Sequence, residues 1–364
     1  MSEAGLKEII LSEIRKEGPI NFERYINYAL YHAEFGYYFA GNVSIGGDRA
    51  DFITSPHVSK IFSRCLANFI LLADKALSSP EVLWVVEGGP GEGELARTIL
   101  DTISARDPDL YSRLRYVTDE VSPALKERQK RLLSPHSERL AKEPPKGFEG
   151  VYLSNELIDA ISFNVFLNRD GAVSEIYVTE EDGELIELEG AVSSPLPEGF
   201  VPGKGVFRFE HAPGVAEWLT RTAERLGRGY ILTIDYGDER GRLFGPQRER
   251  GTARGFSRHT HIEGLLDAPG ECDLTRSVDF TELIDTGSAL GLTAEPLFNQ
   301  RQLLYGLGMV EEVQLLEEES ADEVEALARR HELAPLLLGG VGMGETFKGL
   351  LQVKGAPAGI IKRL

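Results

Sequence analysis

The sequence predicts an α/β fold built around an open, mostly parallel sheet, and two observations support this prediction. From residue 82 onward, short apolar runs alternate with helical patterns, in the order "VLWVVE", "ELARTILDTI", "RYVTDEV", "PALKERQKRLL" and "GVYLSN". Such apolar runs are typical of buried parallel strands, and strands that alternate with helices form parallel sheets with right-handed crossovers. Polar residues follow directly after the runs, where such sheets bind their ligands. We therefore expect a doubly wound sheet with its site at the carboxyl ends of the strands.

The composition is that of a globular protein and disfavours nucleic acid as a partner. The chain has 364 residues, of which 42% are hydrophobic and 27% charged, and its formal net charge is −19. An acidic surface repels phosphate backbones and favours a cationic partner, such as a protein that presents Arg or Lys. Cys65 and Cys272 stand far apart, which indicates neither a disulfide framework nor a thiolate metal cluster.

The sequence carries no signal for export or for a membrane span. No apolar run reaches the roughly 20 residues that a membrane-spanning helix needs. The stretch "MSEAGLKEIILSEIRKEG" lacks the apolar core of a signal peptide and the acid-poor character of a transit peptide. The two distant cysteines indicate a reducing compartment. We expect a cytoplasmic protein that binds no metal and does not insert into a membrane.

Four regions are expected along the chain. Helical periodicity with capping signals indicates helices from about Glu3, from Asn21 and from Ser55. After the strand in "LTIDYG", a Gly- and Arg-rich loop of about 40 residues is expected to be a lid or a disordered segment. The expected regions are 1–80, helical; 81–167 and 228–300, the sheet domain; 168–227, an inserted β-meander and helix; and 301–364, helices and a last strand.

A glycine-rich turn joins the first predicted strand to its helix. Gly89, Gly91 and Gly93 form a G-x-G-x-G pattern, and Glu94 stands where the dinucleotide fingerprint has its third glycine. A helix N-terminus binds anions, but the acids around this turn, beginning with Glu87, would repel a pyrophosphate. S-Adenosylmethionine carries a sulfonium and an ammonium group and no phosphate. The turn therefore favours S-adenosylmethionine, and a nicotinamide dehydrogenase is the weaker alternative.

The second predicted strand ends in two acids, Asp119 and Glu120. One carboxylate accepts hydrogen bonds from both hydroxyls of a ribose, which is the common role of an acid at this point. Neighbouring residues of a strand point to opposite sides, so we expect only one of the two to bind, and we prefer Glu120. A solvated turn acid is the alternative for each.

The strand in "GVYLSNELIDA" ends at Asn155 and Glu156, and Asp159 follows. Methyltransferases that act on DNA adenine or glutamine amides carry an Asn/Asp-Pro-Pro-aromatic tetrad here, and this chain has no proline there. Two carboxylates instead suit a guanidinium, which carboxylates bind bidentately. Asn155, Glu156 and Asp159 are therefore candidate catalytic residues, and Asn155 also a cofactor ligand. Alternatively, Asp159 caps the next segment and Glu156 is a surface acid.

Further candidates lie on loops. Asp235, in "LTIDYG", is expected either to face the substrate or to brace its own turn, and His259 is a candidate proton acceptor. Thr54 and Ser55 are expected to place the N-terminal helices over the cofactor. Asp279 has the spacing of a helix cap rather than of a catalytic residue.

The chain resembles the MidA family over nearly its whole length. The motifs that carry the resemblance, in family order, are "GPINFERYINYALYHAEFGYY", "DFITSPHVSKIF", "VVEGGPGEGELARTIL", "EVSPALKERQ", "NELIDAI", "LTIDYG", "GTARGFSRH", "PGECDLTRSVDF", "NQRQLLYGLG" and "MGETFKGLL". The resemblance implies a class I methyltransferase with a Rossmann-like sheet, S-adenosylmethionine as cofactor, and protein arginine N-methylation. It also implies a part in complex I assembly, because the family's mitochondrial member is held to dimethylate an arginine of a respiratory complex I core subunit. An S-adenosylmethionine-binding assembly factor with little turnover is the alternative.

Overall fold

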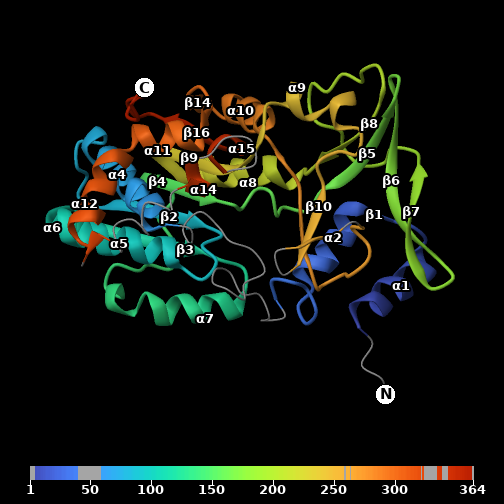
Figure 1. Ribbon diagram of the computed structural model, residues 1–364, viewed down its shortest axis with the longest axis horizontal. Coiled ribbons are helices and arrows are strands. Elements are labelled where there is room, and N and C mark those ends of the chain that lie inside the picture. Colours follow the sequence, from blue (N-terminus) through green and yellow to red (C-terminus); the bar gives the residue numbers. More distant parts are fainter. Residues whose placement is uncertain are drawn as a thin grey trace. The chain divides into compact units, whose positions relative to one another are not determined.

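The structure is a computed structural model that describes residues 5–39, 59–257, 260–262, 264–320, 322–323, 334–337 and 343–362 (Figure 1). The chain divides into two compact units that each draw on three stretches of sequence. Unit 1 comprises Met1–Phe52, Ile158–Trp218 and Asp238–Leu283, and unit 2 comprises Ile53–Leu157, Leu219–Gly237 and Ile284–Leu364. Unit 1 thus takes in two of the N-terminal helices and most of the meander expected as an insertion.

Unit 2 contains the predicted Rossmann-like sheet. Its strands follow the order β14-β16-β9-β4-β2-β3, and β15 pairs with β16 (Figure 1). Strands β9, β4, β2 and β3 are parallel, whereas β16 runs antiparallel to β9. The strands are β2 Leu83–Gly88, β3 Leu114–Asp119, β4 Phe148–Asn155, β9 Leu226–Asp238, β14 Thr293–Ala294, β15 Phe298–Asn299 and β16 Phe347–Lys354. The expected doubly wound α/β class is confirmed, and β4 ends at Asn155 as predicted.

The helices of unit 2 begin where the sequence offers caps. Ser122 accepts a hydrogen bond from the backbone N–H of Leu125 and starts α7, and Asp107 does the same for α6. Ser55 lies outside the described residues, and the described helix α4 has Ser59 as its N-cap. The helices are α4 Lys60–Ala76, α5 Glu94–Arg106, α6 Pro108–Arg113, α7 Pro123–Leu132, η1 Ser134–His136, α11 Gln300–Gly306, α12 Met309–Glu318, α14 Ala334–Leu337 and α15 Met343–Thr346.

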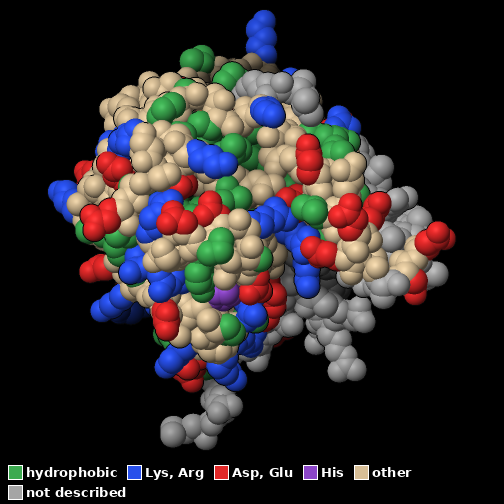
Figure 2. All heavy atoms as spheres, turned by 90° about the vertical axis from the view of Figure 1, so that its left-hand side faces the viewer, with side chains coloured by type: hydrophobic (Ala, Val, Ile, Leu, Met, Phe, Trp, Pro, Cys, Tyr) green, Lys and Arg blue, Asp and Glu red, His purple; other side chains and the backbone are tan. Residues whose placement is uncertain are grey.

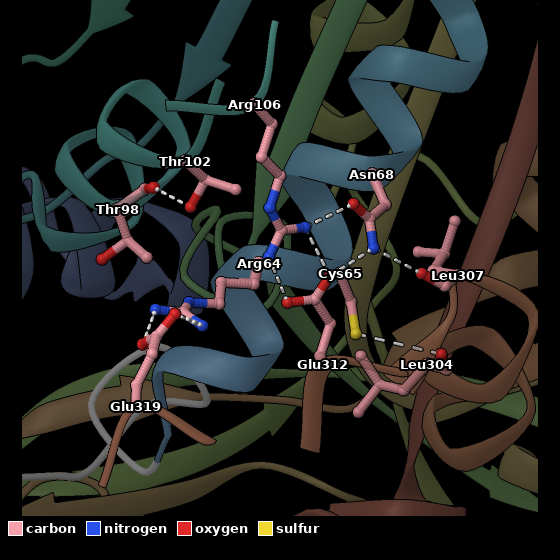
Figure 3. A network of polar contacts seen from close by, with 10 residues as sticks. All are labelled: Arg64, Cys65, Asn68, Thr98, Thr102, Arg106, Leu304, Leu307, Glu312 and Glu319. Carbon is pink, nitrogen blue, oxygen red and sulfur yellow. Dashed lines mark hydrogen bonds and ion pairs between the residues drawn. The ribbon is translucent and has the colours of Figure 1, made fainter. Parts of the chain in front are cut away.

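A buried polar network joins α4, α5 and α12 within the apolar core of unit 2 (Figure 3). The Glu312 carboxylate accepts hydrogen bonds from Arg106 Nη1 and Nη2 at 2.5 and 2.7 Å and from Asn68 Nδ2 at 2.8 Å. The Glu312 side chain is 2% exposed. At the other end of α12, Glu319 accepts two hydrogen bonds from Arg64. This network fixes the acidic helix α12 against α4 and α5.

Unit 1 contains an antiparallel sheet in the order β1-β6-β5-β8, with β7 paired to β6. The predicted turns at "RDG" and "EDG" are two-residue hairpins, because Arg169 pairs with Ala172 and Glu181 with Glu184. Both central residues of each turn have positive φ, which the Asp-Gly sequence favours. The elements are α1 Leu6–Glu17, β1 Ile20–Asn21, α2 Phe22–Tyr31, β5 Asn164–Arg169, β6 Ala172–Glu181, β7 Glu184–Gly190 and β8 Val206–His211.

The long loop after Asp235 is not the structureless lid that the sequence predicted. Within it, β10 pairs antiparallel with both β11 and β12 to form a small sheet. β10 and β11 are neighbours in sequence, since Ser257 pairs with Thr260, whereas β12 pairs with β10 across a long connection that leaves no local pattern in the sequence. The elements are α9 Arg240–Leu243, η2 Pro246–Arg248, β10 Arg254–Ser257, β11 Thr260–Ile262, β12 Asp273–Thr275 and β13 Val278–Asp279.

Two helices, α8 Gly214–Arg225 and α10 Phe280–Ala289, each contain one of the chain's passages between the units. Asp279 Oδ1 accepts the backbone N–H of Thr281 at 3.0 Å, which confirms its expected role as a cap. α8 ends at Arg225, and β9 begins directly after it at Leu226. None of the helices in the described ranges combines the length and apolarity that a membrane crossing requires.

The acidic charge is spread unevenly over the molecule. Figure 2 shows Lys and Arg side chains interspersed with Asp and Glu over the face that carries α4, α5, α6 and α12. The segment 123–146, which includes α7, has seven Lys and Arg against three Glu, a local charge of +4 in a chain of −19. The expected acidic surface therefore does not hold for every face of unit 2.

Candidate active site

The carboxyl ends of four parallel strands meet at one edge of the unit 2 sheet. Gly88 of β2 pairs in register with Asp119 of β3 and with Ser154 of β4. Asn155 of β4 in turn pairs with Ile234 of β9, so that Glu156 and Asp235 follow at neighbouring strand ends. The structure therefore brings most of the predicted site residues of unit 2 to the edge where open α/β sheets bind their ligands.

The glycine turn leaves β2 in a backbone conformation that side chains rarely adopt. Gly89, Gly91 and Gly93 have φ values of 63°, 56° and 93°, and Gly93 is the N-cap of α5. The N–H of Gly89 donates to the carbonyl of Asp119 at 2.9 Å, which ties the turn to β3. A Cβ at position 89 would lie 2.8 Å from Leu157 Cδ1. The turn is thus packed against the residues that follow β4, with the N-terminus of α5 directed to the strand ends.

Glu87 lies beneath the turn and is buried, with 2% of its surface exposed. The hydroxyl of Tyr116, one strand away on β3, donates to Glu87 Oε2 at 2.6 Å. Burial raises the pKa of Glu87 to about 7, the Tyr116 hydrogen bond opposes the shift, and the charge of Glu120 adds to it. This carboxyl group therefore keeps its proton to a higher pH than an exposed glutamate does.

Glu120 lies just past the end of β3 and is also buried. Its Oε1 accepts the backbone N–H groups of Val121 and Ser122 at 2.8 and 2.9 Å. Its Oε2 lies 3.5 Å from Gln129 Nε2, and the backbone N–H of Gly91 also interacts with the carboxylate. Burial raises the pKa of Glu120, and the two N–H groups oppose that shift. One oxygen thus fixes the carboxylate while the other is available to accept hydrogen bonds.

Gln129 joins the glycine turn to Glu120, and the sequence analysis missed it. Its Nε2 donates to the carbonyl of Gly91 at 2.7 Å and faces Glu120 Oε2. Gln129 is buried on α7 four residues after the buried Leu125. A polar residue in the apolar stripe of a helix was the signal that could have revealed it.

Asn155 and Glu156 form a hydrogen-bonded pair where β4 ends. Asn155 Nδ2 donates to Glu156 Oε1 at 3.0 Å, which orients the carboxylate. Asn155 Oδ1 is buried and has no hydrogen-bond partner in the described part of the chain. Glu156 has a φ of 54°, a conformation that costs a residue with a side chain about 1–3 kcal/mol and that collects at functional sites. This strain supports the choice of Glu156 as a functional residue.

The other predicted catalytic residues that the structure describes accept hydrogen bonds within their own units. Asp235 is fully buried, and its Oδ1 accepts the backbone N–H of the next residue, Tyr236, at 2.9 Å. Asp159 belongs to unit 1, where Thr275 Oγ1 donates to its Oδ2 at 2.8 Å. His259, Thr54 and Ser55 lie outside the described residues. Among the residues that the structure describes, no group of three or more His, Cys, Asp or Glu could hold a metal ion.

The residues of unit 2 fit S-adenosylmethionine. A ribose needs an acceptor for two hydroxyls, which Glu120 Oε2 offers because its Oε1 is already occupied. The α5 N-terminus offers backbone N–H groups for a carboxylate. Asn155 Oδ1 is a buried acceptor without a donor in the described ranges. The Glu87 carboxyl group, once ionised, is an anion that can pair with an ammonium group. The ribose, the carboxylate and the ammonium group of the cofactor thus each have a candidate partner of matching chemistry in unit 2.

Comparison with solved structures supports this fold. A crystal structure of a Burkholderia thailandensis protein bound to S-adenosyl-homocysteine superposes with a TM-score of 0.86 at 24% identity, covering 97% of this chain and 92% of that chain. A second crystal structure from the same organism gives 0.84 at 24% identity, with 98% and 93% covered. The two chains therefore share the fold of this protein.

Curated relatives include protein arginine methyltransferases. The Drosophila melanogaster mitochondrial protein arginine methyltransferase NDUFAF7 homolog is 28% identical over 76% of this chain and 68% of its own. The Danio rerio mitochondrial protein arginine methyltransferase NDUFAF7 is 27% identical over 93% and 84%. Both relatives are mitochondrial, so the expectation of a cytoplasmic protein was wrong. Two distant cysteines indicate a reducing compartment but do not distinguish one such compartment from another.

A family model agrees with the chemistry of the site. The model described as "Putative S-adenosyl-L-methionine-dependent methyltransferase" matches residues 65–297, which include the glycine turn, Glu120 and the end of β4. The match covers more than half of the chain, and S-adenosylmethionine is the cofactor that the glycine turn favoured. This chain belongs to that family of S-adenosyl-L-methionine-dependent methyltransferases.

Proposed function

We propose that this chain transfers a methyl group from S-adenosylmethionine to an arginine side chain of a partner protein. The single observation that carries the proposal is the Asn155–Glu156 pair, a strained and hydrogen-bonded carboxylate at the strand end beside the cofactor turn. A carboxylate in this position binds a guanidinium bidentately. The printed function of the curated relatives, protein arginine methylation, agrees with that chemistry.

The chemical problem is that a guanidinium is a poor nucleophile, since it is charged and its pKa is above about 12. When bound, S-adenosylmethionine supplies an electrophilic methyl group on a positively charged sulfur. Glu156 would hold two guanidinium N–H groups and draw positive charge away from the nitrogen that attacks. A carbon–nitrogen bond forms as the carbon–sulfur bond breaks, the sulfur keeps the electron pair, and the methylated nitrogen then releases a proton to water.

Most of the acceleration would come from orientation, which contributes up to about 7–11 kcal/mol in favourable cases. Asn155 serves this end because it fixes one oxygen of the Glu156 carboxylate at 3.0 Å. Asp235, Asp159 and His259 stay proposals for contacts to the substrate and for proton acceptance. The finer identity of the target, a respiratory-complex subunit, rests on the family resemblance alone and belongs to the same proposal.

The test uses the full chain, isotopically labelled S-adenosylmethionine and an arginine-rich protein fraction, with methylated residues identified by mass spectrometry. We expect label on arginine, and we expect Glu156→Gln to reduce turnover roughly 100-fold while the Kd of S-adenosylhomocysteine changes less than twofold. Glu81→Gln is the matched control, because Glu81 is exposed and precedes the opposite end of β2.

Three outcomes would contradict the proposal. Label on lysine or glutamine without label on arginine would refute the substrate class. Tight cofactor binding without methyl release to any protein would favour the assembly factor with little turnover. Equal turnover of Glu156→Gln and the wild type would remove Glu156 from the mechanism.

A further inference from the structure

The segment that follows β3 is basic in a chain that is otherwise strongly acidic. Residues 123–146 contain seven Lys and Arg against three Glu, whereas the whole chain has a formal net charge of −19. Five of these cations are exposed to solvent, and we call them the basic strip: Lys126, Lys130, Arg131, Lys142 and Lys146. The other two, Arg128 and Arg139, are half-buried. The segment therefore presents to solvent a local charge of the sign opposite to that of the whole chain.

The basic strip is built on a segment that is fixed to the sheet of unit 2. At the end of α7, Arg97 Nη1 donates to the carbonyl of Leu132 at 3.0 Å. Further along, the N–H of Tyr116 on β3 donates to the carbonyl of Arg139 at 2.8 Å, and the N–H of Ala141 donates back to the carbonyl of Tyr116 at 2.8 Å. The segment thus covers the outer edge of β3, the last strand in the sheet order (Figure 1). A partner that binds this surface has little backbone to order.

The basic strip begins at the cofactor end of the sheet. α7 starts three residues after Glu120, and Gln129 on its buried side contacts both Glu120 and the glycine turn. Burial raises the pKa of Glu120, and the charge of Lys126 is one of the influences that oppose the rise, which places this lysine near the site. β3 and β4 both run parallel to β2, so the chain returns to the opposite end of the sheet before β4 begins. Lys146 stands two residues before β4, so the strip extends away from the cofactor edge.

The charge pattern favours a short acidic protein segment over a membrane or a nucleic acid. Three exposed acids, Glu127, Glu138 and Glu143, stand among the cations. A phosphate array that extends past the strip would meet these acids and the rest of a chain with a charge of −19. The 10 residues of α7 are about 15 Å long, which an extended peptide covers with about five residues. Charges beyond a Debye length of about 8 Å are largely screened, so a peptide of this length senses mainly the strip.

We propose that the basic strip binds an acidic segment of the protein substrate, several residues away from the arginine that is methylated. This inference rests on the proposed function, because it describes a second feature of the same substrate. Each contact is a surface ion pair of small free energy, so the affinity depends on several of them together. Attraction between opposite charges also increases the rate of association. The expected substrate thus carries an arginine and, nearby in its sequence, a run of Asp and Glu.

The experiment measures peptide binding to the full chain by fluorescence anisotropy, with S-adenosylhomocysteine present. The acidic probe is Gly-Arg-Gly-Ser-Gly-Ser-Glu-Asp-Glu-Asp-Glu, and the matched probe has Gln and Asn in place of Glu and Asp. We expect the acidic probe to bind at least about 10-fold more tightly at low salt, and this advantage to disappear at about 0.5 M salt. Lys130→Gln/Arg131→Gln and Lys142→Gln/Lys146→Gln should each reduce the advantage roughly 3- to 10-fold.

A matched control variant separates the strip from the net charge of the chain. Lys75→Gln/Lys362→Gln also removes two exposed cations of unit 2. Lys75 lies in the last turn of α4, as Lys130 and Arg131 lie in the last turn of α7, so the loss of a favourable helix-end charge is shared. The control should leave the Kd of each probe within about twofold of the wild-type value. Lys126 is kept in every variant because of its position near Glu120.

Four results would overturn the proposal. Equal affinity of the wild type for the two probes would reduce the strip to a solvated surface, and equal losses in the control would reduce it to net charge. Tighter, strip-dependent binding to phosphatidylglycerol vesicles or to a DNA oligonucleotide would assign it to a different partner. A lower Tm of the free protein in the strip variants, with no change in the preference for the acidic probe, would indicate a partner within the chain. Anisotropy needs no methyl transfer, so failure of arginine methylation is distinguishable from failure of this inference.

Discussion

The buried carboxyl group of Glu87 should make the stability of this protein depend on pH in a defined window. Its pKa is about 7 in the folded protein, against a reference value of 4.5, because burial disfavours the charged form. The folded state therefore holds a proton that the unfolded chain has already released between these two values. The contribution of Glu87 is most favourable below about pH 4.5 and is lost as the pH rises through about 7.

The magnitude follows from the size of the pKa shift. One pKa unit corresponds to about 1.4 kcal/mol, so the full difference amounts to about 3 kcal/mol of the free energy of unfolding. Glu87→Gln removes the ionisation and keeps an oxygen that can accept the Tyr116 hydroxyl. We therefore expect the variant to be similar to the wild type at pH 5 and more stable by up to about 3 kcal/mol at pH 8.

Urea unfolding of both proteins from pH 5 to pH 8 measures this effect. The quantity of interest is the difference between the two free energies of unfolding, because contributions from other titrating groups cancel in it. Glu81→Gln, which changes an exposed acid near the same strand, should show no pH-dependent difference from the wild type. Parallel stability profiles for the wild type and Glu87→Gln would refute the argument.

Three further substitutions test the site and its support. Glu120→Gln should raise the Kd of S-adenosylhomocysteine roughly 10- to 100-fold by calorimetry, since the oxygen proposed to accept the ribose hydroxyls would be replaced by an amide NH2 donor. Glu312→Ala should lower the free energy of unfolding by about 3–5 kcal/mol in urea, because it leaves Arg106 without its carboxylate, whereas exposed Glu311→Ala should change it by less than about 0.5 kcal/mol. Glu156→Gly should raise the free energy of unfolding by about 1 kcal/mol through relief of its positive φ, and should abolish methyl transfer in the labelling assay.

Much of the fold was predictable because its elements carry local signals. The apolar run "FKGLLQVK" coincides with β16 Phe347–Lys354, and the two Asp-Gly turns determine the hairpins of unit 1. The stretch "LTAEPLF" contains two short strands, β14 and β15, separated by a segment that includes Pro296, which cannot donate to a ladder. The pairing of β12 with β10 was missed because it joins residues distant in the sequence.

The site was predictable where it depends on the order of strand ends and not where it depends on packing. Glu87, Glu120 and Asn155 each follow or end a buried strand, so the topology alone gathers them. Tyr116 and Gln129 contact these residues from another strand and from a helix. Which buried tyrosine or glutamine faces a carboxylate depends on the tertiary arrangement, which no spacing in the sequence encodes.

The charge of the glycine turn shows why such packing changes a chemical argument. From the sequence alone, Glu87, Glu92 and Glu94 were interpreted as three anions that would repel a pyrophosphate. In the structure Glu87 has a pKa of about 7, and Arg128 donates to Glu92 at 2.7 Å. Of these three acids, only Glu94 is exposed to solvent. Preference for a cationic cofactor therefore depends less on the net charge of the glycine turn than on Glu87. An ammonium group that pairs with Glu87 would displace its proton. The affinity for the cofactor should therefore increase as the pH rises through about 7.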